Sequence, residues 1–167
     1  FAYVTNTASN TISVISTASN TVTATIPVGS GPFRVAVTPN GKFLYVSLAG
    51  SNNVYVIATA NNAVVKKIPV GGSYGLAIAP NGNFVYAGAT SVSVISTSTN
   101  SVVATIPIPG LVTDIAFTPD SRIAYLPNRD DPMVFVIYTA SNTVIQKIPL
   151  SGNRKASPSR RTGISST

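Results

Sequence analysis

Short apolar stretches alternate with polar turns along most of the chain. In the best-defined unit, apolar segments at 34–38, 43–47, 54–58 and 63–68 are separated by stretches rich in Gly, Asn and Ser. The segments are five or six residues long and rich in β-branched side chains, which favours strands. No stretch has the apolar spacing of an amphipathic helix. The pattern predicts an antiparallel meander of four short strands.

The same phrases then return at a nearly constant interval. Thr17-Ala18-Ser19-Asn20-Thr21-Val22 has counterparts that begin at Thr59, Thr97 and Thr139, at spacings of 42, 38 and 42 residues. Each copy is followed by an Ile-Pro pair. Proline cannot donate to a strand ladder, so this pair is expected at the end of an edge strand.

A second phrase keeps the same interval and contains a tyrosine. Thr38-Pro39-Asn40-Gly41 leads into a segment with Tyr45, and its counterparts contain Tyr86 and Tyr125, while Tyr3 begins the series. Four short strands per repeat of about 40 residues are typical of a propeller blade. We therefore predict an all-β fold, a β-propeller of four-stranded antiparallel blades with four repeats, either a four-bladed ring or part of a larger propeller. The expected blades span 1–28, 29–70, 71–108 and 109–150.

The repeats are out of phase with the chain by one strand. The chain starts on a second strand, so the first blade lacks an inner strand at this end. Residues 151–167 stand where that strand is expected, but they are basic and lack alternating apolar positions. Three interpretations stay open: a basic tail that acts as a degenerate closing strand, a piece of a longer propeller, or two chains joined into an eight-bladed ring.

These phrases resemble a known repeat family. Ala2-Tyr3-Val4-Thr5-Asn6, with the Asn-Thr-Val and Ile-Pro-Val-Gly phrases, is similar to the YVTN-type β-propeller repeat over residues 1 to about 150. The resemblance implies a surface-layer or other secreted protein, usually of about seven blades and mostly without an assigned activity. One branch of that family resembles periplasmic propellers that bind single-stranded DNA. A more distant group comprises antibiotic lyases that need a histidine and a metal ion.

The composition limits the catalytic and metal-binding chemistry that is open to this chain. The chain has no Cys and no His, which removes disulfides, thiolate nucleophiles and the commonest general base. We expect no enzyme activity, no cofactor, no metal site and no membrane span, and no signal peptide is visible. The net charge of +7 is concentrated at one end, since residues 1–153 carry seven basic and four acidic groups. We therefore rank nucleic acid behind protein as the expected partner.

Candidate binding residues lie where the inner strands begin. Equivalent positions hold Phe33-Arg34, Tyr74-Gly75 and Thr113-Asp114, which differ between repeats while their flanks stay alike. Arg34 and Asp114 are placed to pair across a narrow channel, and the two aromatic rings to stack on a flat ligand. Ordinary drift at exposed positions is the alternative. The acidic loop 128–132 is expected to be a solvated turn rather than a calcium site.

The sequence thus favours a non-catalytic binding or structural module that is extracellular, at the cell surface or periplasmic. Protein binding or self-association, including a homodimer, is the expected partnership. The alternatives are a propeller that binds a ligand such as single-stranded nucleic acid, and a fragment of a larger propeller enzyme.

Overall fold

The chain folds into four antiparallel sheets that stand side by side as blades. The structure is a computed structural model, and it describes residues 1–150. The first blade contains three strands, in the order β1-β2-β3, and the other three contain four strands each in sequence order. This arrangement confirms the predicted β-propeller class, and it also confirms that the chain enters the first blade without an inner strand.

The first two blades contain seven strands, which are β1 (Ala2–Asn6), β2 (Thr11–Ser16), β3 (Thr21–Pro27), β4 (Pro32–Val37), β5 (Phe43–Leu48), β6 (Asn53–Ala58) and β7 (Ala63–Pro69). The last two contain β8 (Gly75–Ile78), β9 (Phe84–Gly88), β10 (Ser91–Ser96), β11 (Ser101–Pro107), β12 (Ala116–Phe117), β13 (Ile123–Pro127), β14 (Met133–Tyr138) and β15 (Thr143–Pro149). Every Ile-Pro pair ends the strand at one edge of its sheet, as expected. No helix long or apolar enough to cross a membrane occurs within residues 1–150.

Asparagines shape the turns that lead into these edge strands. The turn before each of β3, β7, β11 and β15 ends on an asparagine with φ between 50° and 58°, namely Asn20, Asn62, Asn100 and Asn142. Asparagine tolerates this left-handed conformation better than other residues that carry a side chain. The recurring Asn of the sequence repeat is therefore a backbone requirement of each blade.

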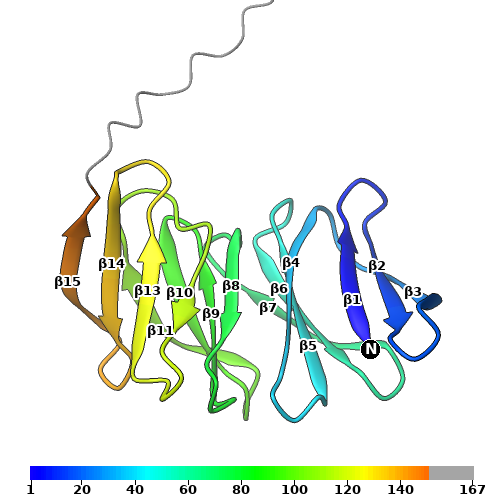
Figure 1. The fold of residues 1–167 in the computed structure, drawn as a ribbon. Coiled ribbons are helices and arrows are strands. Elements are labelled where there is room, and N and C mark those ends of the chain that lie inside the picture. Colours follow the sequence, from blue (N-terminus) through cyan, green and yellow to red (C-terminus); the bar gives the residue numbers. More distant parts are fainter. Residues whose placement is uncertain (151–167) are drawn as a thin grey trace, which may run out of the picture.

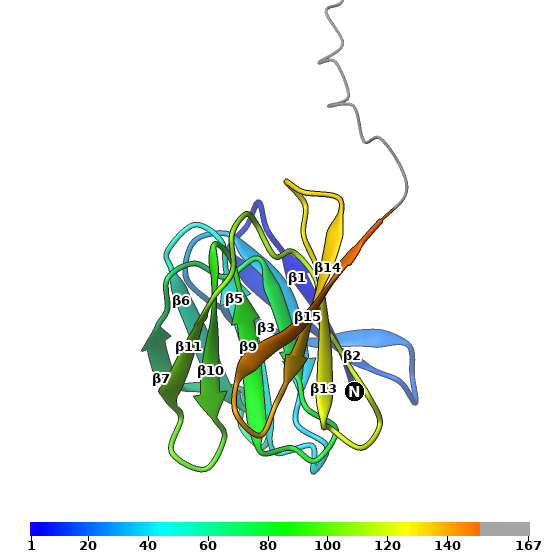
Figure 2. The same cartoon turned by 90° about the vertical axis from the view of Figure 1, so that its left-hand side faces the viewer.

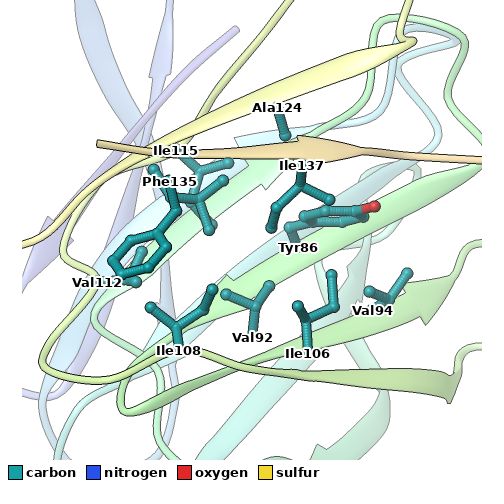
Figure 3. Close-up of a cluster of buried hydrophobic side chains, with 11 residues drawn as sticks. Tyr86, Val92, Val94, Ile106, Ile108, Val112, Ile115, Ala124, Phe135 and Ile137 are labelled. Atoms are coloured by element: carbon teal, nitrogen blue, oxygen red, sulfur yellow. The ribbon is translucent and has the colours of Figure 1, made fainter. Parts of the chain in front are cut away.

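The core lies between the blades. Each buried cluster contains side chains from two neighbouring blades, so no blade has a core of its own. Figure 3 shows the cluster between the third and fourth blades, where Tyr86, Val92 and Ile106 face Phe135 and Ile137. Burying a side chain of this size contributes roughly 1.5–3 kcal/mol. Stability therefore resides mainly in the junctions between blades.

The four blades form an open arc. In Figure 1 the first blade (β1–β3) and the fourth blade (β12–β15) lie at opposite ends of the row, with the other two between them. The view turned by 90° in Figure 2 looks along this row, with the fourth blade in front of the others. Residues 1–150 therefore do not close into the four-bladed ring that was one of the two predicted forms. The predicted closing strand, 151–167, lies outside the described residues.

Candidate functional site

The inner strands begin side by side, and the predicted site residues gather there. Strand β4 contacts both β1 and β8, so the inner ends of the first three blades are neighbours. Phe33 and Arg34 are the second and third residues of β4, Tyr74 directly precedes β8, and Thr113 and Asp114 precede β12. Residues from the second, third and fourth blades come together here, through the contacts Phe33–Tyr74, Arg34–Asp114 and Arg34 with the Thr113 carbonyl. We call Phe33, Arg34, Tyr74, Thr113 and Asp114 the axial cluster.

A β-bulge exposes the first aromatic ring. Pro32 pairs with Leu48 and Arg34 pairs with Ser47, which leaves Phe33 as the extra residue between two regular pairs. The backbone N–H of Arg34 donates to the hydroxyl of the buried Ser47 at 2.9 Å, which fixes the strand beyond the bulge. Bulges redirect side chains in this way near functional sites. Phe33 is 43% exposed as a result, although it belongs to an inner strand.

The two rings of the axial cluster contact each other. Phe33 and Tyr74 have centroids 5.9 Å apart and meet edge to face at 75°. Such a pair contributes about 0.5–1.5 kcal/mol beyond its buried area. The sequence predicted that both rings were available to one flat ligand. The structure brings them together and packs them against one another, so one side of the pair is already occupied.

The predicted ion pair forms beside these rings. Arg34 Nη2 lies 4.0 Å from Asp114 Oδ2, and the two side chains are 46% and 64% exposed. The same nitrogen donates to the Thr113 carbonyl at 3.5 Å, and the guanidinium carbon lies 5.7 Å from the centre of the Phe33 ring. An ion pair so exposed is worth about 0–1 kcal/mol. Its groups remain accessible to a ligand.

Glycine occupies the equivalent position of the third blade, where the backbone of the next blade lies very close. A Cβ on Gly75 would lie 3.3 Å from the backbone of Thr113 and Asp114. Gly75 thereby lets the fourth blade bring Asp114 towards Arg34. This close approach could not be predicted from the sequence, where Gly75 looked like one more variable position.

The acidic loop is a structural turn. Asn128 Oδ1 accepts hydrogen bonds from the backbone N–H groups of Asp130 and Asp131, at 2.9 and 3.2 Å. Asp130 accepts from the backbone of Leu111 at 3.0 Å and from Arg129 at 3.2 Å. Within residues 1–150, no three carboxylates or other metal-binding side chains gather into a site. The carboxylate of Asp130 is thus already used to hold the loop.

The recurring tyrosines link neighbouring blades. Tyr45 donates to Asn100 Oδ1 at 2.5 Å and Tyr86 donates to Asn142 Oδ1 at 2.6 Å. Burial raises the pKa of both hydroxyls to about 12. The rings of Tyr45 and Tyr86 are buried between blades. The sequence did not show that the partner is the left-handed asparagine of the next blade.

Grooves of similar size lie at the three junctions. Their volumes are about 310, 350 and 360 Å³, and each includes one of the left-handed turn asparagines. Because these grooves recur with the repeat, they follow from blade packing. The groove between the first and second blades differs from the other two. Its lining includes Tyr3 and Asn62, and the buried side-chain oxygen of Asn62 has no hydrogen-bond partner among the described residues.

Comparison with known proteins supports the fold. No protein-family model matches the chain, and no curated protein matches it. Among solved structures, hydrazine synthase from Kuenenia stuttgartiensis is 25% identical to this chain, with a TM-score of 0.81. The match covers 87% of this chain and 45% of that chain. This chain therefore spans less than half the length of its structural neighbour. Since 952 solved chains match, the likeness identifies a widespread architecture.

Proposed function

We propose that this chain is a non-catalytic β-propeller module whose axial cluster recognises a partner outside the cell, at the cell surface or in the periplasm. The main observation behind this proposal is that three successive blades place two aromatic rings, a cation and a carboxylate close together. Function in such folds resides in residues grafted on a regular scaffold. The similarity to YVTN-type repeats of secreted proteins supports the location.

Energetics support a recognition role for the axial cluster. Its ion pair is exposed and contributes little to stability, so stability alone does not account for it. Arg and Tyr are also the residue types that contribute most at protein interfaces. A peptide with an acidic group and a flat side chain fits this chemistry, because Arg34 and the exposed Phe33 lie side by side.

Residue-resolved NMR titration tests this proposal. We expect an acidic, tyrosine-containing peptide to shift the signals of the axial cluster selectively, and Arg34→Ala to weaken its binding at least fivefold. Arg122→Ala is the matched control, since Arg122 is equally an exposed arginine but lies in the turn between β12 and β13. Equal effects of the two variants would contradict a role for the axial cluster.

Single-stranded nucleic acid is a second candidate ligand. An arginine beside exposed aromatic rings is the combination on which bases stack and phosphates bind. Fluorescence anisotropy with a labelled oligothymidylate should then show an affinity that falls steeply with salt. No measurable binding at low salt would eliminate this candidate.

The enzymatic alternative concerns a longer protein. The structural neighbour is named as a synthase, but this chain spans only 45% of it, and the name describes that protein. An activity that requires further blades is tested by assaying the complete gene product beside this chain.

A further inference from the structure

The junction between the second and third blades and the junction between the third and fourth blades are built from equivalent residues. One blade contributes the tyrosine of its second strand and the isoleucine of its Ile-Pro pair, and both are buried by the next blade. Tyr45 and Tyr86 are 0% and 1% exposed, and Ile68 and Ile106 are both 2% exposed. The next blade contributes the left-handed asparagine that accepts the tyrosine hydroxyl.

Within residues 1–150, the fourth blade presents one half of such a junction that no other blade covers. Tyr125 is 39% exposed, in contrast to its buried counterparts, and Ile148 is only partly buried. Ala116, the counterpart of the partly buried Ala36 and Ala77, is exposed. We call the surface formed by Ala116, Tyr125 and Ile148 the tyrosine face. Side chains alternate along β13, so Tyr125 lies on the opposite side of the blade from Ala124 and Leu126, which pack against the third blade.

The first blade presents the other half. Val4 is 46% exposed, whereas its counterparts Val46, Ala87 and Leu126 are all 0% exposed. Val22 is 59% exposed, whereas its counterparts Val64 and Val144 pack into the junctions with the preceding blades, and Asn20 has a φ of 53°, within the range of the other turn asparagines. We call the surface formed by Val4, Asn20 and Val22 the asparagine face. Tyr3 packs in the cluster shared with the second blade, so Val4, the next residue of β1, lies on the opposite side of the first blade.

We propose that the asparagine face of a second copy of this chain covers the tyrosine face, with Tyr125 donating to Asn20 of the other copy. The two surfaces are complementary because they repeat the junctions that already occur within the chain. The pairing is reciprocal, so two arcs related by a two-fold axis form two identical junctions and a ring of eight blades. Head-to-tail contacts close when the rotation per copy permits it, and eight blades lie within the range of propellers.

A second copy satisfies requirements that an unrelated partner does not. The occupant must present a left-handed asparagine at the distance of one blade from Tyr125, together with apolar side chains opposite Ile148. The first blade of this chain presents both in the register that the other junctions use. The proposal is independent of the axial cluster, which lies at the ends of the inner strands.

Native mass spectrometry and light scattering on the 167-residue chain test the proposal. We expect a dimer of twice the 17.2 kDa chain mass that persists on dilution. Tyr125→Glu should convert it into a folded monomer, because Tyr125 is partly exposed within one chain. Val65→Glu is the matched control: Val65 is 50% exposed on β7, away from both faces, and this variant should remain dimeric.

A mixing experiment distinguishes head-to-tail pairing from other dimers. Val22→Glu should also be monomeric, since it damages the asparagine face. Mixed with Tyr125→Glu, it should restore a dimer that contains one copy of each, because one head-to-tail junction is still intact. A wild-type monomer at every concentration would overturn the proposal. A dimer that tolerates Tyr125→Glu, or a series of larger oligomers, would overturn it as well.

Discussion

The hydroxyl of Tyr86 links the third and fourth blades, and its removal tests how the junctions are stabilised. Tyr86→Phe leaves the ring in place, including its edge-to-face contact with Phe117 at a centroid distance of 5.0 Å. The variant removes one hydrogen bond, from Tyr86 to Asn142 Oδ1, which measures 2.6 Å. The ring is 1% exposed, so water does not replace the lost group on that side.

The expected cost follows from this geometry. A typical internal hydrogen bond contributes about 1 kcal/mol net, and an acceptor left without a partner costs about 1–3 kcal/mol. Asn142 is half-buried, so water partly compensates its oxygen. We therefore expect Tyr86→Phe to lower the free energy of unfolding by about 1–2 kcal/mol. For a chain of this size the midpoint temperature should fall by about 3–6 °C.

A double-mutant cycle in urea, followed by circular dichroism, isolates the bond. Asn142→Gly removes the acceptor but keeps a residue that adopts the left-handed turn, since Asn142 has a φ of 53°. In that background Tyr86→Phe should cost little, which gives a coupling energy of about 1 kcal/mol. Strictly additive effects would show that the hydroxyl is not coupled to Asn142, and would refute the reasoning.

Three further predictions concern stability. Above pH 10 the protein should lose stability. The pKa of Tyr45 and of Tyr86 is about 12 in the folded state and 10 in the unfolded state, so the folded state keeps both hydroxyls neutral while the unfolded state releases their protons. The loss in the free energy of unfolding should be about 2 kcal/mol per tyrosine by pH 12, measured by urea unfolding across that range. Gly88→Ala should destabilise by about 1–3 kcal/mol, since its Cβ would lie 2.7 Å from Val112 Cγ1, and an unchanged thermal midpoint would contradict this. Arg34→Ala should change the free energy of unfolding by less than about 1 kcal/mol, because its ion pair is exposed.

Much of the fold was predictable because the repeat imposes the same local physics four times. The Asn turns, the Ile-Pro edge strands and the buried positions of Tyr45 and Tyr86 all follow from residue types that recur in register. The curvature was not predictable. It depends on small rotations between blades, which result from side-chain packing such as that between Gly88 and Val112.

The candidate site was predicted in position but only partly in geometry. Equivalent positions of a repeat come together at the axis, so the repeat predicts that Arg34 and Asp114 lie near each other, while the distance of their ion pair depends on the close packing at Gly75. The bulge that exposes Phe33 and the edge-to-face contact with Tyr74 depend on tertiary packing, and no sequence pattern marks them.

A crystal structure of the 167-residue chain tests most directly whether its open blade faces pair with each other. We predict a closed ring of eight blades from two chains, in which the Tyr125 hydroxyl lies within hydrogen-bonding distance of Asn20 of the second chain and Val22 is buried. A separate arc with Tyr125 in solvent, or two arcs joined through other surfaces, would contradict the account.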